Sequence, residues 1–187
     1  DFDAVARTIR VEAGITVGDL LRFAVAHDLY VPVLPGHPAI SVGGCVAGNI
    51  HGKTQRGVGN FGEHLTSPTL LHPDHGTIVC GPPECAEIFE LTVGGFGLTG
   101  YIADVTLALA PLPGAAVVRD VGSTTSLQET VEVMRRTDPA APVYSWNDLQ
   151  RRGRGFGSGV VYQERFEAGP QPPGDVRYRS LSSRRLP

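Results

Sequence analysis

The spacing of apolar and polar residues changes twice within the first twenty-five positions. Apolar and polar side chains alternate over residues 8–11, which is typical of a half-buried β-strand, and Gly14 ends this segment. Apolar side chains then recur at helical spacing over residues 17–25. Thr16 and Asp19 form a capping box at the start of this stretch, with Asp in place of the usual Glu. The pattern predicts a strand followed by a capped helix.

A long aperiodic segment follows. A short apolar run at residues 30–33 predicts one more strand, but residues 34–60 are mostly glycine, proline and small side chains without a sustained helix or strand period. A loop of this length inside a compact domain is usually functional or disordered. We therefore expect residues 34–60 to lack regular structure and to carry function.

Regular patterns return beyond residue 64. Two apolar runs around a Pro-Asp-His-Gly turn predict a β-hairpin, and further periodic segments lie on both sides of Pro111 and Pro113. The predicted segments are strands 65–71 and 77–80, helix 84–92, strands 102–109 and 116–121, helix 126–136, and strands 143–146 and 159–166.

The two prolines are predicted to mark a domain boundary. We expect a first domain over residues 1–112 and the beginning of a second over residues 113–166. Residues 167–187 are rich in Pro, Gly and Arg and have little apolar surface to bury, so they are predicted to be a disordered tail.

Composition argues against several classes of protein: membrane-spanning, nucleic-acid-binding and disulfide-rich secreted proteins. Hydrophobic residues make up 41% of the chain and charged residues 19%, as in ordinary globular proteins, and no apolar run approaches the ~20 residues that a membrane span needs. A net charge of -3 argues against a nucleic-acid partner. The cysteines Cys45, Cys80 and Cys85 are few and odd in number, which favours free thiols in a reducing compartment over a disulfide framework. No secretory signal opens the chain.

The segment SVGGCVAGNIHGKT, residues 41–54, combines four glycines with one histidine and one lysine. Glycines let a backbone approach a ligand closely, and successive free amides in such loops form anion-binding nests. A diphosphate is the ligand that this chemistry predicts. The side chains of His37, Ser41, Asn49 and His51 would add hydrogen bonds, and Lys53 a point charge. A Gly-rich turn packed for structural reasons is the alternative.

Two further patterns have weaker functional interpretations. Residues 95–100 match the dinucleotide fingerprint G-x-G-x-x-G, but a helix precedes them and a strand follows, which is the reverse of the order that the fingerprint requires. Nicotinamide binding here is a minor alternative. His72, Asp74 and His75, with His64 nearby, form a possible metal cluster, but Asp-His-Gly is ordinary turn chemistry. We expect no metal site.

The order of motifs resembles a known family of flavoproteins. From about residue 11 to 166 the chain is similar to the vanillyl-alcohol oxidase and p-cresol methylhydroxylase type, and within it to the decaprenylphosphoryl-ribose oxidase-like branch. The similarity rests on five segments in the family's order: VEAGITVGDLL, LPGHPAISVGGCVAGNIHGKT, GNFGEHLTSPTLLHPDHGTIVC, FELTVGGFGLTGYIADVTLAL and VYSWND.

This resemblance implies an α+β fold: an FAD-binding domain, represented in this chain by its second subdomain, followed by the start of an α+β substrate or cap domain. FAD is expected to be held noncovalently, with its diphosphate and flavin along residues 36–51 and its adenine end near Ile102. The residues implied in cofactor binding are Gly36, His37, Ser41, Gly43, Gly44, Gly48, Asn49, Ile50, His51, Gly97 and Ile102.

The resemblance also implies which residues lie on the substrate side of the flavin. His51, Gly52 and Lys53 match the branch's His-Gly-Lys beside the flavin, and Ser145 and Trp146 match positions that line the same pocket. His51 and Lys53 are the candidate catalytic residues, although His51 is expected to orient or polarise the substrate and not to act as the general base. Alternatives are a structurally held His51 and a core aromatic at Trp146.

The implied activity is FAD-dependent oxidation of a CH–OH group in a sugar, polyol or polyprenylphosphoryl sugar, a precursor of cell-wall polysaccharide. A partner reductase is a further implied partner. We expect the protein in the cytoplasm or peripherally at a membrane. A sugar-lactone or alditol oxidase is an alternative within the family.

Two family features have no match here. The family's first subdomain, with a Gly-Arg-Gly-x-x-x-Ser-Tyr-Gly-Asp-like loop, and the rest of its cap domain are not found. The chain is therefore expected to be the middle of an oxidase, with FAD binding weakened by a missing wall of the site. The alternative to an enzyme is a noncatalytic protein: a remnant or interaction module that keeps the scaffold of the FAD domain.

Overall fold

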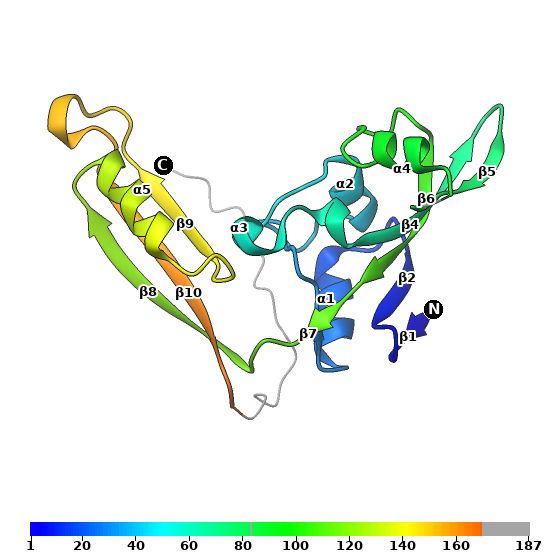
Figure 1. Cartoon of the computed structure of the whole chain (residues 1–187), viewed down its shortest axis with the longest axis horizontal. Coiled ribbons are helices and arrows are strands. Elements are labelled where there is room, and N and C mark those ends of the chain that lie inside the picture. The colour runs from blue at the N-terminus through cyan, green and yellow to red at the C-terminus, as the bar shows by residue number, and fades with distance from the viewer. Residues whose placement is uncertain (83, 170–187) are drawn as a thin grey trace, which may run out of the picture.

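The computed structural model describes residues 1–82 and 84–169 as two parts that meet along one side (Figure 1). Most of the predicted tail, residues 170–187, lies outside the described residues. The elements of the first part are β1 (Phe2–Asp3), β2 (Thr8–Glu12), α1 (Val17–Val25), β3 (Leu29–Tyr30), α2 (Val42–Ala47), α3 (Gln55–Val58), a 3-10 turn (Phe61–His64), β4 (Leu65–His72), β5 (Gly76–Val79), α4 (Ala86–Thr92), β6 (Tyr101–Ala108) and β7 (Ala110–Pro111). Those of the second part are β8 (Ala116–Thr124), α5 (Leu127–Arg136), β9 (Val143–Asn147), a 3-10 turn (Gly153–Gly155) and β10 (Gly159–Glu167).

The first part is built on an antiparallel sheet of five strands in the order β1-β2-β6-β4-β5. Helices α1 and α2 share one hydrophobic core with β2, β4 and β6, and Leu20, Phe61, Leu70 and Val105 are among its fully buried side chains. Each large apolar side chain buried in this way contributes about 1.5–3 kcal/mol. This core fixes where α2 and the loops around it lie.

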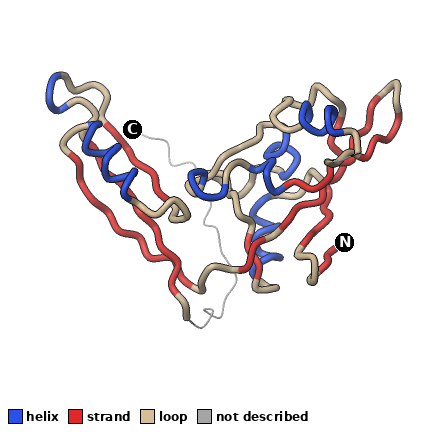
Figure 2. The backbone as a smooth tube through the Cα atoms, in the orientation of Figure 1, coloured by secondary structure: helices blue, strands red, loops and turns tan. Residues whose placement is uncertain are grey.

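The second part is an antiparallel sheet of three strands in the order β8-β10-β9, with α5 lying along one face (Figure 2). β10 pairs with β8 over nine residues, from Gly159 opposite Thr124 to Glu167 opposite Ala116. Ser126 caps α5 by accepting a hydrogen bond from the Glu129 amide at 3.2 Å. The division into domains at residues 112 and 113 stays a prediction.

Most predicted elements are confirmed. Thr16 caps α1 as predicted, because its Oγ1 accepts a hydrogen bond from the Asp19 amide at 3.1 Å. The hairpin appears as β4 and β5, and the four elements predicted beyond residue 113 appear as β8, α5, β9 and β10. The strand predicted at residues 30–33 is shorter, since only Leu29 and Tyr30 pair with β7 and Pro32 has no amide hydrogen to donate.

The prediction that residues 34–60 lack regular structure is wrong. Helices α2 and α3 both lie in this segment. Val42, Cys45 and Val46 are fully buried and follow helical spacing, but α2 has only six residues, two of them glycine. Fewer than two turns give too little periodicity to recognise in a sequence.

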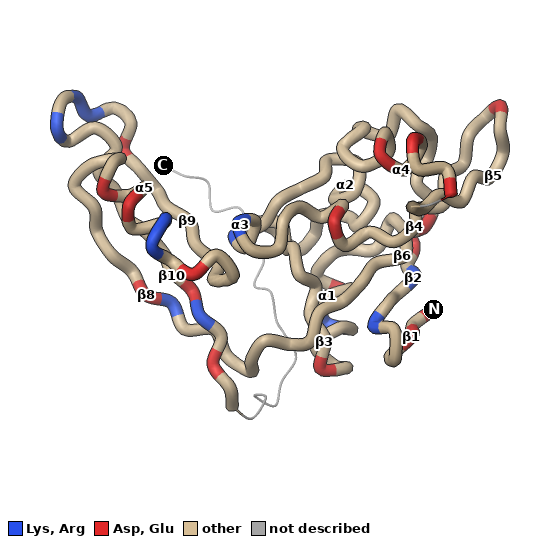
Figure 3. The backbone as a smooth tube through the Cα atoms, in the orientation of Figure 1, with Lys and Arg blue, Asp and Glu red and all other residues tan. Residues whose placement is uncertain are grey.

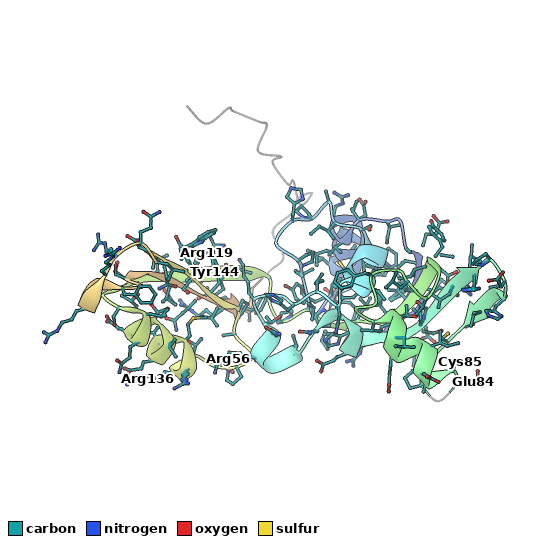
Figure 4. All side chains as sticks on the ribbon, turned by 90° about the horizontal axis from the view of Figure 1, so that it is seen from above. Arg56, Glu84, Cys85, Arg119, Arg136 and Tyr144 are labelled. Carbon is teal, nitrogen blue, oxygen red and sulfur yellow. The ribbon has the colours of Figure 1, made fainter. Side chains whose placement is uncertain are left out.

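The two parts meet at residues 53–57, which include α3 (Figures 1 and 4). The Val143 amide donates to the Lys53 carbonyl at 3.1 Å. The Arg56 guanidinium donates to carbonyl oxygens at the C-terminal end of α5, those of Met134, Arg135 and Thr137. A cation at this end complements the helix dipole. Segment 53–57 therefore attaches the second sheet to the first part.

Candidate functional site

An open groove of about 740 Å³ runs along the first part between α2 and the loops that precede β6. Five of the residues predicted to bind the cofactor line it: Ser41, Gly43, Gly44, Gly97 and Ile102. The other lining residues are Ala13, Gly14, Ala47, Leu71, His72, Pro73, Leu98, Gly100 and Tyr101. The two glycine-rich segments of the sequence, around residues 42 and 100, therefore border the same groove.

Five of the fourteen residues that line the groove are glycines: Gly14, Gly43, Gly44, Gly97 and Gly100. A Cβ built on Gly14 or Gly97 would meet nothing within 4 Å, so a ligand can approach the main chain there. Gly97 also has a φ of 78°, a conformation that favours glycine. None of the lining side chains is Asp, Glu, Lys or Arg, and Figure 3 shows α2 free of charged residues. A dianionic linker would meet no carboxylate side chain here and could approach the main chain closely, so the lining is compatible with the diphosphate of FAD.

The predicted nest of free amides at Gly43, Gly44 and Gly48 is wrong. Their amides already donate within the protein, to Ala13 O at 2.8 Å, to Ser41 Oγ at 3.2 Å and to Gly44 O at 3.0 Å. Gly43 instead has a packing role, because a Cβ there would lie 2.8 Å from Ala13 Cβ. The groove offers a ligand close contact with this backbone and the Ser41 hydroxyl, which can still donate its hydrogen while accepting from Gly44.

Four predicted cofactor residues, His37, Gly48, Asn49 and Ile50, line neither the groove nor the pocket described next. Asn49 follows α2 with a φ of 39°, and its Oδ1 accepts a hydrogen bond from the Gly62 amide at 3.0 Å. His37 Nδ1 accepts from the Ala39 amide at 3.2 Å. These contacts give Asn49 and His37 local structural roles, and their binding roles stay predictions.

A second hollow, a pocket of about 660 Å³, lies where the first part meets the three-stranded sheet. Gly36, His51, Gly52, Lys53 and Ser145 line it, so four of the five predicted substrate-side residues converge from two distant segments. Its apolar wall comes from Val17, Leu21, Tyr30, Leu34, Val117, Met134, Val143 and Phe166, with several prolines. The pocket combines an apolar wall with a few polar groups, as ligand sites generally do.

Trp146 does not line this pocket. It is 71% exposed, so the structure does not place it in the core either. Its neighbour Ser145 points the other way along β9 and donates to Asn147 Oδ1 at 2.7 Å. Trp146 shares its face of β9 with Tyr144, which does line the pocket, but lies two residues further along the strand.

Lys53 is the centre of a charged cluster at the pocket. Its Nζ lies 3.3 Å from Glu164 Oε1 and 4.0 Å from the centre of the Tyr144 ring. Arg119 reaches the same Oε1, with its terminal nitrogen at 2.7 Å. The hydrogen bond from Arg119 to Glu164 raises the pKa of the guanidinium above its ordinary value. Glu164 itself is only 8% exposed.

Sequence reasoning missed Arg119, Tyr144 and Glu164. Each lies on a predicted strand, and the alternation of β10 indicates which face its side chains take. Pairing of β10 with β8 and β9 brings the three together, and that pairing has no local signature. Within the described residues, no group of three or more His, Cys, Asp or Glu side chains is arranged to hold a metal ion.

Comparison with known proteins identifies an FAD binding domain in the first part. Residues 1–81 match the family of FAD binding domains. The chain is 38% identical over 153 residues to a decaprenylphosphoryl-beta-D-ribose oxidase of Mycolicibacterium smegmatis, covering 79% of this chain and 33% of the relative. It is 34% identical over 113 residues to an alditol oxidase of a Streptomyces species, covering 59% of this chain and 26% of the relative.

A solved structure has the same fold. The 6-hydroxy-D-nicotine oxidase of Arthrobacter nicotinovorans superposes with a TM-score of 0.67 at 18% identity, covering 87% of this chain and 36% of that one. The chain thus spans about a third of the length of these proteins. The matched FAD binding domain, the oxidase relatives and the shared fold lead to one conclusion: the chain contains an FAD binding domain of the vanillyl-alcohol oxidase and p-cresol methylhydroxylase type, and its cofactor is FAD.

Proposed function

We propose that the chain is part of an FAD-dependent oxidoreductase that oxidises a CH–OH group of a polyprenylphosphoryl sugar. The observation that carries this proposal is the course of one segment. Ser41, Gly43 and Gly44 line the groove and residues 51–53 line the pocket, so a single stretch of chain connects the two hollows. Such a stretch is suited to hold a cofactor on one side and a substrate on the other.

In this proposal Ser41, Gly43, Gly44, Gly97 and Ile102 hold FAD. When bound, FAD supplies the acceptor for the hydride that leaves the substrate carbon. Residues 1–112 are then the FAD-binding part and residues 113–166 the beginning of the substrate-binding part.

The chemistry of the pocket fits an amphipathic substrate. Tyr30, Leu34 and Phe166 offer apolar surface, while Lys53 provides a positive charge and His51 an imidazole that can hydrogen-bond a hydroxyl. A polyprenylphosphoryl sugar carries the matching groups: a chain, a phosphate and hydroxyls. Decaprenylphosphoryl-ribose oxidase is also the name of the relative with 38% identity. The described residues contain no helix long and apolar enough to cross a bilayer, and such a substrate would be reached at a membrane surface.

The test is anaerobic reduction of flavin. The chain is loaded with FAD, and a polyprenylphosphoryl ribose is added while the visible absorbance of the flavin is followed. We expect bleaching, and we expect Lys53→Gln to slow it by roughly 10- to 100-fold, because a mispositioned substrate loses reactivity steeply. Gly122→Ala is the control, since a Cβ at this exposed position in β8 meets nothing within 4 Å.

A sugar-lactone or alditol oxidase is the second candidate, favoured by the similarity to an alditol oxidase and to a rice L-galactono-1,4-lactone dehydrogenase, 32% identical over 107 residues. Bleaching by an alditol or an aldonolactone but not by the polyprenylphosphoryl sugar would establish this candidate instead. If FAD is bound and none of the three bleaches it, the oxidase proposal fails and a noncatalytic role is favoured.

A further inference from the structure

Lys53 is the single lysine of the chain: of 16 cationic residues, the other fifteen are arginines. The two residue types are not interchangeable. Arginine presents a planar fork of five donors, whereas the lysine ammonium is a compact charge with three donors. A chain that otherwise uses arginine throughout has the compact cation at the pocket wall, where Lys53 is found.

Glu164 holds this cation from the other part of the molecule. It lies on β10 directly opposite Arg119 of β8, and its Oε1 is 2.9 Å from Arg119 Nε and 3.3 Å from Lys53 Nζ. Burial of a carboxylate is costly unless charged donors compensate it. At 8% exposure, Glu164 satisfies this condition only with its two cations in place.

Two tyrosines provide a platform beneath the ammonium. Tyr144 of β9 and Tyr162 of β10 are cross-strand partners whose rings stack at 4.7 Å with an angle of 8° between the planes. Lys53 Nζ lies 4.0 Å from the centre of the Tyr144 ring, within the range of a cation–π interaction. The ammonium is thus held between a carboxylate and a ring face.

The charges at this cluster do not cancel. Lys53 and Arg119 share one carboxylate, so one positive charge remains at the pocket wall. The neighbouring Arg56 donates to the carbonyl oxygens at the end of α5. The Lys53 side chain stays 41% exposed, and one of its three donors reaches Glu164. Lys53 therefore keeps donors for a ligand oxygen.

From this geometry we propose that Glu164 is a positioning residue: it orients the Lys53 ammonium over Tyr144, so that the spare donors face an oxygen of the bound substrate. The inference rests on the proposed function for its role in catalysis. The claim that Glu164 holds the ammonium over Tyr144 can be tested independently of that function, because the position of the ammonium can be measured without FAD or substrate.

The experiment uses nuclear magnetic resonance on the 187-residue chain labelled with ¹³C,¹⁵N-lysine, which produces one lysine spin system. Protons above the face of an aromatic ring are shielded, so the ε-CH₂ signal of Lys53 is expected upfield of free lysine. Tyr144→Leu should abolish this shift. Glu164→Gln should move the signal most of the way to its free-lysine position, while Asp120→Asn, which removes an exposed partner of Arg165 on the same sheet, should leave it unchanged.

A wild-type signal at the free-lysine position, or an unmoved signal in Glu164→Gln, overturns the proposal. If Glu164→Gln does not fold, Glu164→Asp provides the same test, because the shorter acid keeps a charge for Arg119 while withdrawing it from Lys53. An unmoved signal in folded Glu164→Asp would also overturn it. Failure of the flavin-bleaching assay would leave these spectra unaffected, so the two proposals fail separately.

Discussion

The two sheets of this molecule differ in how they are packed. The five-stranded sheet shares a core of nineteen buried apolar side chains with α1 and α2. In the second part, of the residues described from 113 to 169, the buried apolar side chains are Pro142, Val143 and Val161, and β8 exposes Val117 and Val121. The groove therefore lies on a scaffold with its own core, whereas the pocket depends on how a thinly packed sheet is held against that scaffold.

This difference indicates where each sheet obtains its stability. Apolar burial supplies most of the favourable free energy of folding, and the first part has most of that burial. The second sheet must rely more on backbone pairing and on its attachment through residues 53–57. Changes in the core should consequently act on the whole fold, and changes in segment 53–57 on the second part.

The largest effect is expected from Leu70→Ala. Leu70 is fully buried in β4, and such a truncation costs about 2–5 kcal/mol. Val161→Ala removes less apolar surface and should cost roughly 2 kcal/mol. Urea unfolding followed by amide signals from both sheets measures the two. Leu70→Ala should lower the midpoint of both sheets and Val161→Ala mainly that of residues 113–169. Equal, global losses in the two variants would remove the distinction between the sheets.

A smaller and more local effect is expected from Gly57→Ala. The new Cβ would lie 2.6 Å from the Pro139 carbonyl oxygen, a contact that requires the backbone to move. Overpacking of this kind costs about 1–3 kcal/mol. Hydrogen exchange in α5 should accelerate roughly tenfold, since each 1.4 kcal/mol is a factor of ten. Exchange in α1 should not change, and Gly122→Ala is the matched control. Equal acceleration in α1 and α5 would show that segment 53–57 is not a local attachment.

Thiol reactivity probes the packing around α2. Burial raises the pKa of Cys45 to about 11, whereas Cys85 is exposed at the start of α4. Because the thiolate is the reactive form, Cys45 should react with a disulfide reagent at pH 8 at least tenfold more slowly than Cys85. Mass spectrometry of the modified peptides measures both rates. Similar rates in the native chain would mean that α2 is not packed as described.

The smallest effect concerns pH. Hydrogen bonding to Arg10, and also to Thr69, holds the pKa of Asp104 below its ordinary value. This stabilisation is present above the ordinary carboxylate pKa and is lost as the pH falls through the lower, folded-state pKa. Asp104→Asn should therefore lower the melting temperature by about 2 °C at pH 7 and by less at pH 3. A loss that grows toward low pH would contradict the assigned direction.

Local signals in the sequence were sufficient for elements with their own periodicity. Thr16 with Asp19 predicted the start of α1, and the turn around Asp74 predicted the β4–β5 hairpin. Helix α2 was missed because its apolar pattern of Val42, Cys45 and Val46 spans five residues. A pattern of that length is indistinguishable from a glycine-rich loop.

Part of the candidate site was predicted from the sequence, but the glycines contribute to it in a different way from the one expected. The glycines were expected to present free amides, but Gly43 and Gly44 use their amides inside the protein and provide bare surface to the groove. Glu164 could not be predicted, because its partner Lys53 is 111 residues away and only the docking of β10 brings them together. Side chains paired across parts have no signature in a single sequence.

The central claim is that the groove between α2 and the start of β6 holds FAD. The most direct measurement is a titration of the ¹⁵N-labelled chain with FAD, followed by amide signals. We predict saturable shifts at Ser41, Gly43, Gly44, Gly97 and Ile102, none at Gly122, and loss of these shifts in Gly14→Leu, because Gly14 lines the groove and a Cβ there meets nothing within 4 Å. An absence of shifts at millimolar FAD, or saturable shifts confined to residues 113–169, would contradict the claim.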